Sequence, residues 1–241
     1  MQMSNYIKSR VLENVEISPG IHKISLDINL GAQPGQFFML RCDSYSIDPI
    51  LSRPFGVCDQ KEDRLVFLCQ VVGKATKLIG GLKKDDKVSI LGPLGQGFDI
   101  KNEGKVAIVA GGIGIAPLLE LAKALDNKAD FYGGFQDKPY FVDEFKPFVE
   151  NIVTSSERIE NKLILDKLDP DKYDIIYACG PNPMLKALYE KNTKANIQVS
   201  MEAHMACGIG ACLGCTVKDS NEHYVRVCKD GPVFDAERIF G

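Results

Sequence analysis

The sequence predicts an α+β protein in three parts: an N-terminal antiparallel β-barrel, a doubly wound α/β domain built on a parallel sheet, and a small C-terminal unit. Three observations predict this arrangement. Residues 1–100 contain short β-rich runs separated by Gly and Pro, residues 101–199 alternate strand and helix patterns, and residues 200–241 hold half of the eight cysteines. A chain of 241 residues is long enough for two compact domains.

The composition is typical of a soluble globular protein, with 45% hydrophobic and 25% charged residues. The net charge of −3 provides no basic field that would favour nucleic acid. The first ten residues lack the apolar segment of a signal peptide, and no apolar run approaches the roughly 20 residues that cross a bilayer. We therefore expect a cytoplasmic protein with neither a membrane nor a nucleic-acid partner.

The first part is expected to fold as a small barrel or sandwich, because its β-rich runs are short and closely punctuated. One motif lies between these runs: Arg53-Pro54-Phe55-Gly56. An arginine can bind a phosphate with two parallel hydrogen bonds, although Arg-Pro pairs are also common in ordinary loops. The expected strands cover residues 21–30, 36–41, 64–72 and 87–91.

The second part begins with residues 106–110, a continuous apolar run typical of a strand buried on both faces. A glycine-rich turn follows, and then a helix is expected over residues 117–125. This alternation predicts a doubly wound parallel sheet. Further strands are expected over residues 129–133, 151–154 and 174–178, and a further helix over residues 183–191.

Two turns of this domain are candidates for binding a nucleotide. Gly111, Gly112 and Gly114 come between a strand and a helix, where backbone N–H groups suit a pyrophosphate, although a tight turn without a ligand has the same pattern. Cys179, Gly180 and Pro181 end the last parallel strand, and ligands bind at that edge of open α/β sheets. A nucleotide is the candidate ligand here, with Cys179 either facing a nicotinamide or buried as a small thiol. Residues 136–138 contain no arginine for the extra phosphate of NADP.

The third part is dominated by Cys207, Cys212, Cys215 and Cys228. Thiols stay reduced in the cytosol, so the cluster indicates metal or redox chemistry. The C-x₄-C-x₂-C run is the plant-type [2Fe–2S] spacing, whereas structural zinc usually takes two short cysteine pairs. The spacing therefore favours a [2Fe–2S] cluster over zinc.

Taken in order, these motifs resemble the ferredoxin-reductase superfamily. Within it, residues 201–215 and 227–234 look like the electron-transfer subunits of type B, NAD-dependent dihydroorotate dehydrogenase, and the resemblance covers essentially the whole chain. It implies FAD in the barrel, a [2Fe–2S] cluster, NAD, and an FMN-containing catalytic subunit as partner in a heterotetramer of two plus two. Electrons from the oxidation of dihydroorotate, a step of de novo pyrimidine (UMP) biosynthesis, would pass from FMN through the cluster and FAD to NAD⁺.

The resemblance also implies site residues. Gly56 stands where the family has Ser, and Ala75 stands where it has Gly. No catalytic side chain is implied, because the cofactors carry the chemistry. The partner is expected to dock on Met205, Ala206 and Leu213. The implied flavin-binding residues are Arg53, Pro54, Phe55, Gly56, Leu68, Cys69, Gln70, Ala75 and Thr76.

Two alternatives remain open on these residues. The flavin and iron–sulfur subunit of a sulfide dehydrogenase or of an NADPH:ferredoxin oxidoreductase shares the same layout. A zinc-stabilised binding module on a reductase fold belongs to a different class, because it would carry no redox cofactor.

Overall fold

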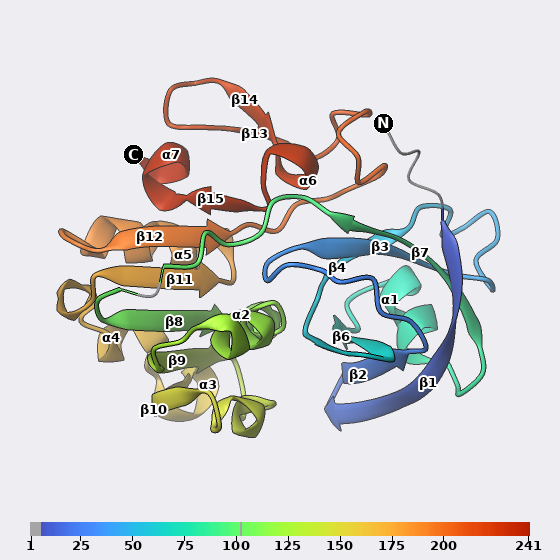
Figure 1. Cartoon of the computed structure of the whole chain (residues 1–241), viewed down its shortest axis with the longest axis horizontal. Helices are drawn as coiled ribbons and strands as arrows, with labels where there is room; N and C mark the ends of the chain where they lie inside the picture. Colours follow the sequence, from blue (N-terminus) through green and yellow to red (C-terminus); the bar gives the residue numbers. More distant parts are fainter. Residues whose placement is uncertain (1–5, 102) are drawn as a thin grey trace.

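A computed structural model of the chain describes residues 6–101 and 103–241. The barrel stands on the right of Figure 1 and the parallel-sheet domain on the left, and the C-terminal segment runs across the top of both. In the described part of the chain, no helix has the length and apolar character needed to cross a membrane.

The N-terminal domain is a seven-stranded antiparallel sheet in the order β4-β3-β7-β1-β2-β6-β5. It curves until β4 and β6 come into contact, and edge-to-face pairs of Phe67 with Phe38 and Phe55, at 5.9 and 6.3 Å between ring centroids, fill its interior. This confirms the predicted barrel. Its elements are β1 (Ile7–Ser18), β2 (Ile21–Leu26), β3 (Phe37–Cys42), β4 (Arg53–Gly56), β5 (Asp59–Lys61), β6 (Arg64–Gln70), α1 (Lys74–Gly80) and β7 (Lys87–Leu94).

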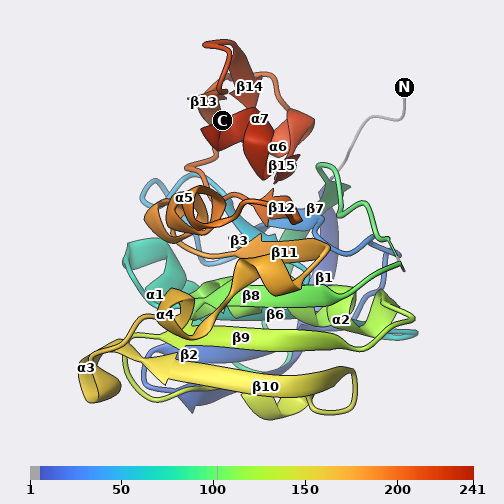
Figure 2. The same cartoon turned by 90° about the vertical axis from the view of Figure 1, so that its left-hand side faces the viewer.

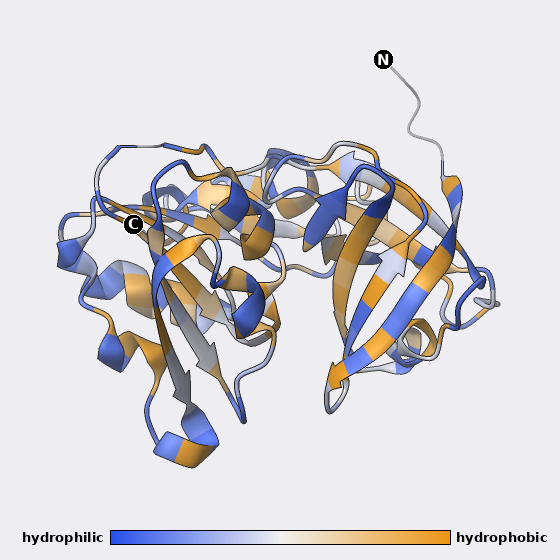
Figure 3. Cartoon of the chain, turned by 60° about the horizontal axis from the view of Figure 1, so that its bottom comes forward, coloured by the Kyte–Doolittle hydropathy of each residue, from blue (hydrophilic) through white to orange (hydrophobic). Residues whose placement is uncertain are grey.

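Three strands of the barrel, β1, β4 and the three-residue β5, were not among the expected ones. Strand β1 mixes hydrophilic and hydrophobic residues along its length (Figure 3), and half of its residues are exposed, so its apolar pattern is weak. Strand β4 contains Pro54, which cannot donate to a sheet and is tolerated because β4 lies at the edge. The Arg-Pro motif therefore sits on a strand rather than in a loop.

The second domain is a six-stranded sheet in the order β10-β9-β8-β11-β12-β15, parallel except for β15. Its strands stack in Figure 2 with helices on both faces. Alternate residues of β8 face opposite sides: Ile108 packs with Leu118 and Leu121 of α2, whereas Val109 packs with Leu185 of α5. The doubly wound prediction is thus confirmed. Its elements are β8 (Val106–Gly111), α2 (Leu118–Ala124), β9 (Ala129–Phe135), β10 (Val149–Ser156), α3 (Glu157–Glu160), α4 (Ile164–Lys167), β11 (Ile175–Cys179), α5 (Asn182–Lys191) and β12 (Asn196–Ser200), with 3₁₀ turns at Gly112–Ile115, Val142–Phe145 and Pro170–Lys172.

The C-terminal segment is not separate from this sheet. The hairpin β13 (Thr216–Lys218) and β14 (Tyr224–Arg226) is followed by α6 (Val227–Asp230), β15 (Val233–Asp235) and α7 (Ala236–Phe240). Strand β15 pairs antiparallel with β12, and α7 lies against α5. Residues beyond the expected boundary at residue 200 therefore extend the same sheet, and the division into three domains stays a prediction.

Two buried side chains fasten the link between the barrel and the parallel-sheet domain. The Gln198 side chain accepts a hydrogen bond from the Asp99 N–H at 2.9 Å and donates to the Asp99 carbonyl at 2.8 Å. The Tyr177 hydroxyl also donates to the Asp99 carbonyl and accepts from the Lys101 N–H. These bonds fix how the two domains meet.

Replacing Gln198 by Leu keeps the side-chain volume and removes both bonds to Asp99. We expect the free energy of unfolding to fall by about 1–2 kcal/mol, since the Asp99 N–H loses its partner while the Asp99 carbonyl keeps only the bond from Tyr177. Denaturant unfolding measures this, with Asn196→Ala, an exposed change on the same strand, as the control. An equal loss in both variants would contradict the assigned role of Gln198.

Candidate functional site: an interdomain cleft and a cysteine loop

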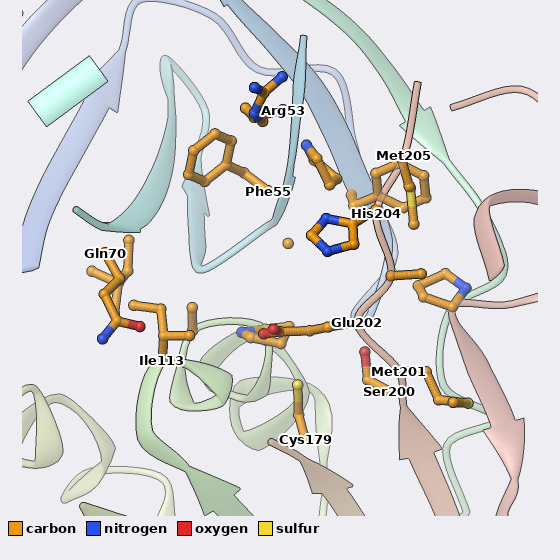
Figure 4. Close-up of a pocket in the computed structure, with 18 of the residues that line it drawn as sticks. Arg53, Phe55, Gln70, Ile113, Cys179, Ser200, Met201, Glu202, His204 and Met205 are labelled. Carbon is orange, nitrogen blue, oxygen red and sulfur yellow. The ribbon is translucent and has the colours of Figure 1, made fainter. Parts of the chain in front are cut away.

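A cleft of about 660 Å³ lies between the two domains. The barrel, the turn after β8, the end of β11 and the segment after β12 all line it, as Figure 4 shows. Its volume is within the ordinary range for sites that take a small molecule or cofactor. Its lining is mostly apolar, and the exposed side chains of Leu51 and Val72 form part of it.

Most of the implied flavin residues lie on the barrel side of this cleft. Strand β4 contributes four of them, β6 contributes Leu68 and Gln70, and α1 contributes Thr76. Cys69 points the other way, because successive side chains of a strand alternate, and burial in the barrel core raises the pKa of its thiol to about 12. Ala75 is also in the core, and its carbonyl accepts a hydrogen bond from Tyr45. Neither Cys69 nor Ala75 presents a side chain to the cleft.

Local hydrogen bonds orient the two polar groups of the motif. The Arg53 guanidinium donates to the carbonyls of Leu51 and Ser52, at 2.8 and 3.3 Å. The Thr76 hydroxyl accepts from the N–H groups of Val72 and Gly73 and donates to the Gly73 carbonyl. The hydroxyl is therefore used to start α1, and the N–H groups of the first helical turn are the free donors there.

The structure gives a steric reason for glycine at position 56. A Cβ atom there would lie 3.1 Å from Cβ of Pro117, which stands at the start of α2 on the opposite side of the cleft. A serine would press the two domains apart at this contact. The departure from the family's Arg-Pro-x-Ser pattern therefore goes with the close approach of Pro117.

The two turns of the parallel-sheet domain press against each other. A Cβ atom at Gly114 would lie 2.4 Å from the Cys179 carbonyl oxygen, and the side chains of Pro181 and Met184 close over Gly111. Gly112 instead faces open space. The structure thus brings the two predicted nucleotide turns together at one sheet edge, and Cys179 lines the cleft between them and the barrel.

Several cleft residues come from the segment after β12, which sequence reasoning did not assign to this site. Glu202 points into the cleft beside Cys179, and His204 follows on the same segment (Figure 4). Burial raises the pKa of the Cys179 thiol. Desolvation by the surrounding protein atoms also raises the pKa of the Glu202 carboxyl group. The sequence carried one signal for them: the segment directly follows a strand that ends at the binding edge.

The four cysteines gather on a loop and a short helix. The N–H of Gly210 donates to Cys228 Sγ at 3.1 Å, and the N–H groups of Cys212, Gly214 and Cys228 each reach a cysteine sulfur at 3.4 Å. Such donors stabilise thiolates and cluster sulfurs. Burial raises the pKa of Cys207, but these and neighbouring N–H groups outweigh it and lower the pKa to about 6.

The thiols are arranged in two pairs. The N–H of Cys212 donates to Cys207 Sγ, and these two are the more exposed pair. The N–H of Cys228 donates to Cys215 Sγ, and these two are buried. Within residues 6–101 and 103–241, no three metal-binding side chains converge on a point that would hold one ion. Two pairs fit a centre with two irons, each taking two thiolates, better than they fit tetrahedral zinc.

Arg226 holds the cysteine loop against α6. Its guanidinium forms two hydrogen bonds with the Asp230 carboxylate, at 3.0 and 3.1 Å, and a third with the Gly210 carbonyl. The same pairing lowers the pKa of Asp230. This support was not predicted, because an Arg and an Asp four residues apart are common on helices.

Comparisons with known proteins agree with this geometry. Residues 202–240 match the family model described as the iron–sulfur cluster binding domain of dihydroorotate dehydrogenase B. The electron transfer subunit of dihydroorotate dehydrogenase B (NAD(+)) from Clostridium acetobutylicum is 42% identical over 236 residues, which cover 95% of each chain. The corresponding subunit from Clostridium perfringens is 41% identical and is matched over 97% of this chain and 98% of its own.

The chain belongs to the family of these electron transfer subunits. A solved structure reported for an NADH-dependent reduced ferredoxin-NADP oxidoreductase superposes with a TM-score of 0.85 and 30% identity, over 96% of this chain and 89% of that one. A ferredoxin reductase of carbazole 1,9a-dioxygenase shares the fold, with a TM-score of 0.63 and 17% identity over 78% of this chain and 66% of its own. The predicted resemblance and fold class are both confirmed.

Replacing Gly114 by Ala places a methyl group against the Cys179 carbonyl and forces the two nucleotide turns apart. We expect NADH binding to weaken by roughly tenfold and stability to fall by about 1–3 kcal/mol, as for other overpacked sites. Fluorescence titration and thermal unfolding measure the two effects. Gly20→Ala, a left-handed turn position with open space around it, is the control for stability alone. Unchanged NADH affinity in Gly114→Ala would place the nucleotide elsewhere.

Proposed function

We propose that this chain is the electron transfer subunit of an NAD-dependent dihydroorotate dehydrogenase and works in the cytoplasm. It would take electrons from the FMN of a catalytic subunit that oxidises dihydroorotate to orotate, in de novo pyrimidine biosynthesis, and deliver them to NAD⁺. The observation that carries the proposal is the near full-length match to electron transfer subunits of that name. A heterotetramer of two copies of each subunit is part of the proposal.

The cleft fits a flavin on its own residues. An apolar wall from β4 and β6 suits a flat ring, and Leu51 and Val72 would be covered by a bound molecule. Arg53 and the free N–H groups at the start of α1 would hold phosphates. FAD bound here would supply the exchange between one-electron and hydride chemistry.

The cysteine loop fits a [2Fe–2S] cluster. Cys207 and Cys212 would hold one iron, Cys215 and Cys228 the other, and the N–H donors described above would point at their sulfurs. On the nucleotide side, Gly111, Gly112 and Gly114 with Cys179, Gly180 and Pro181 would bind NAD. The open position of Gly112 leaves room for a pyrophosphate to approach the backbone.

The protein matrix connects the cysteine loop to the cleft over a short path. A Cβ atom at Gly208 would lie 2.5 Å from Cγ of Met39, so the loop rests directly on β3. Phe37, two residues earlier on the same strand, lines the cleft. The segment from Met201 to Met205 lines it as well and leads covalently to Cys207. Loop and cleft are therefore adjacent, as electron transfer requires.

The surface of the cysteine loop suits a partner protein. Ile209 and Leu213 are apolar and are 49% and 63% exposed. Large apolar groups that stay exposed together mark interaction sites. Of the three predicted docking residues, Leu213 points outward, Ala206 is half-buried, and Met205 lines the cleft. The catalytic subunit would dock over the exposed pair Cys207 and Cys212, which shortens the distance to its FMN.

A second candidate is the flavin subunit of an NADPH:ferredoxin oxidoreductase. The 30% identity and TM-score of 0.85 to the NADH-dependent reduced ferredoxin-NADP oxidoreductase structure favour it specifically. Coexpression with a candidate catalytic subunit under anaerobic conditions separates the two. Copurification and orotate-dependent reduction of NAD⁺ would support the first proposal, whereas activity confined to ferredoxin and NADPH would replace it with the second.

The anaerobically purified chain should contain two irons and two sulfides, together with one FAD. We expect Cys228→Ser to lose the cluster and keep the FAD, because Cys228 lies on α6, away from the cleft lining. Iron and sulfide analysis with the visible spectrum measures both. Cys42→Ser, a buried thiol of the barrel core, should keep all the iron. A colourless protein holding zinc would contradict both cofactor assignments.

Leu213→Asp should weaken binding of the catalytic subunit by about 10- to 100-fold, as loss of a central apolar contact does. Leu213 already has a left-handed backbone, φ 60°, which Asp tolerates better than Leu, so the fold should not suffer. Ile159→Asp is the matched control, because Ile159 is 62% exposed on α3, far from the cysteine loop (Figure 1). Sedimentation or surface-based binding assays measure the affinity. Equal weakening by both variants would argue against this docking surface.

A further inference from the structure

Glu202 is the acidic side chain of the cleft among the described residues that line it. It follows Met201 at the end of β12, and its carboxyl group extends into the cleft next to Cys179 and Ile113 (Figure 4). The surrounding wall is largely apolar. A carboxyl group in such a place, turned toward the space that a cofactor would fill, calls for a chemical reason.

No partner neutralises this carboxyl group. In the portion of the chain that the structure describes, Glu202 makes neither a hydrogen bond nor an ion pair. The residue as a whole is exposed to solvent, but protein atoms of the cleft surround its carboxyl group, and this desolvation raises its pKa. Its neighbours Cys179 and Tyr140 are uncharged. Burial first, and the Glu202 charge second, raise the pKa of both groups, that of the Tyr140 hydroxyl to about 12. His204 lies on the same segment, and Arg53 lies on the barrel side, bonded to carbonyl groups.

The reaction needs a proton in this cleft, a point that rests on the proposed function. An iron–sulfur cluster delivers electrons one at a time and without protons. A hydride given to NAD⁺ comprises two electrons and one proton. The balance is therefore NAD⁺ + 2 e⁻ + H⁺ → NADH, and each turnover must bring one proton into a cleft that the bound cofactors would close to water.

We propose that Glu202 relays this proton, taking it from water at the mouth of the cleft and giving it to the flavin ring as the electrons arrive. The O–H bond of Glu202 would break as its proton passes to a ring nitrogen of bound FAD, and solvent would return a proton to the carboxylate. The flavin would supply the hydride chemistry, in which that hydrogen and the two electrons from the cluster would pass to the nicotinamide carbon. Glu202 suits the role better than Cys179, because its side chain lies in the cleft and also reaches solvent, whereas the Cys179 thiol is buried. Tyr140 is not among the residues that line the cleft.

Glu202→Gln in the FAD- and cluster-loaded chain, bound to the catalytic subunit, tests the relay. We expect NAD⁺ reduction by dihydroorotate to slow by roughly 100-fold, the lower end for a positioned acid. Hydride transfer from NADH to the oxidised flavin, measured by rapid mixing, should be much less affected, because the hydride itself brings the hydrogen that the flavin takes up. Glu202→Asp should recover part of the rate with the solvent isotope effect of the wild type, and Glu150→Gln, exposed on β10, is the control.

Two measurements on Glu202 do not depend on turnover. In protein labelled with ¹³C at glutamate carboxyl groups, one NMR signal should titrate above the ordinary glutamate range and be missing in Glu202→Gln. The wild type should also lose stability relative to Glu202→Gln as pH rises from the unfolded-state glutamate pKa, near 4.3, to the raised folded pKa, and show no difference below both. The sign follows because the unfolded chain releases its proton first.

The outcomes separate this inference from the proposed function. Equal slowing of both directions would mean that Glu202 orients the nicotinamide, and unchanged rates would mean that water delivers the proton; either result overturns the relay. In either case the proposed function still holds if the protein binds FAD and accepts hydride from NADH. A chain that holds no flavin would overturn the proposed function itself.

Discussion

The pairing of β15 with β12 is the constraint on which the rest of the site depends. It places Val233 directly opposite Ser200, so the whole cysteine segment leaves the sheet and returns to it at neighbouring positions. Both ends of that segment are hydrogen-bonded to a sheet whose other strands carry the nucleotide turns. The cysteine loop is thereby held over the cleft, and its position is set by the same strands that position Cys179.

Close contacts at glycines help to bring the three parts together. Gly56 of the barrel meets Pro117 of the parallel-sheet domain, and Gly208 of the cysteine loop meets Met39 of the barrel. Within the parallel-sheet domain, Gly114 meets the Cys179 carbonyl. Contacts of this kind leave little room for adjustment, because interiors are packed to the density of crystals. The cleft therefore has a fixed width, and its few polar groups, Glu202 among them, act from fixed places.

The sequence predicted the barrel, the doubly wound sheet and the cysteine cluster, because each has a local signature: punctuated strands, a continuous apolar strand before a glycine turn, and a set of spaced thiols. It did not predict β4, because Pro54 is compatible with a strand only at the edge of a sheet, and which strand lies at an edge depends on how the strands pair. It also placed Cys69 and Ala75 with the flavin, whereas strand alternation and core packing turn their side chains away. Glu202 escaped prediction because its neighbours in the cleft are distant along the chain. The Arg226–Asp230 pair escaped it because an Arg and an Asp four residues apart are common on helices.

Strand β3 carries Phe37 at the cleft and Met39 under the cysteine loop, and this has a consequence for how precisely the two centres are spaced. Two residues along a strand span about 6.6 Å. Between Phe37 and Met39 the register of β3 with β4 is regular, whereas its register with β7 shifts at a bulge. Their separation is therefore a property of covalent geometry, insensitive to side-chain motion or to which partner is bound. Strand β3 of the barrel thus sets the spacing between the cleft and the cysteine loop. Substitutions elsewhere can alter the driving force for electron flow while leaving that spacing unchanged.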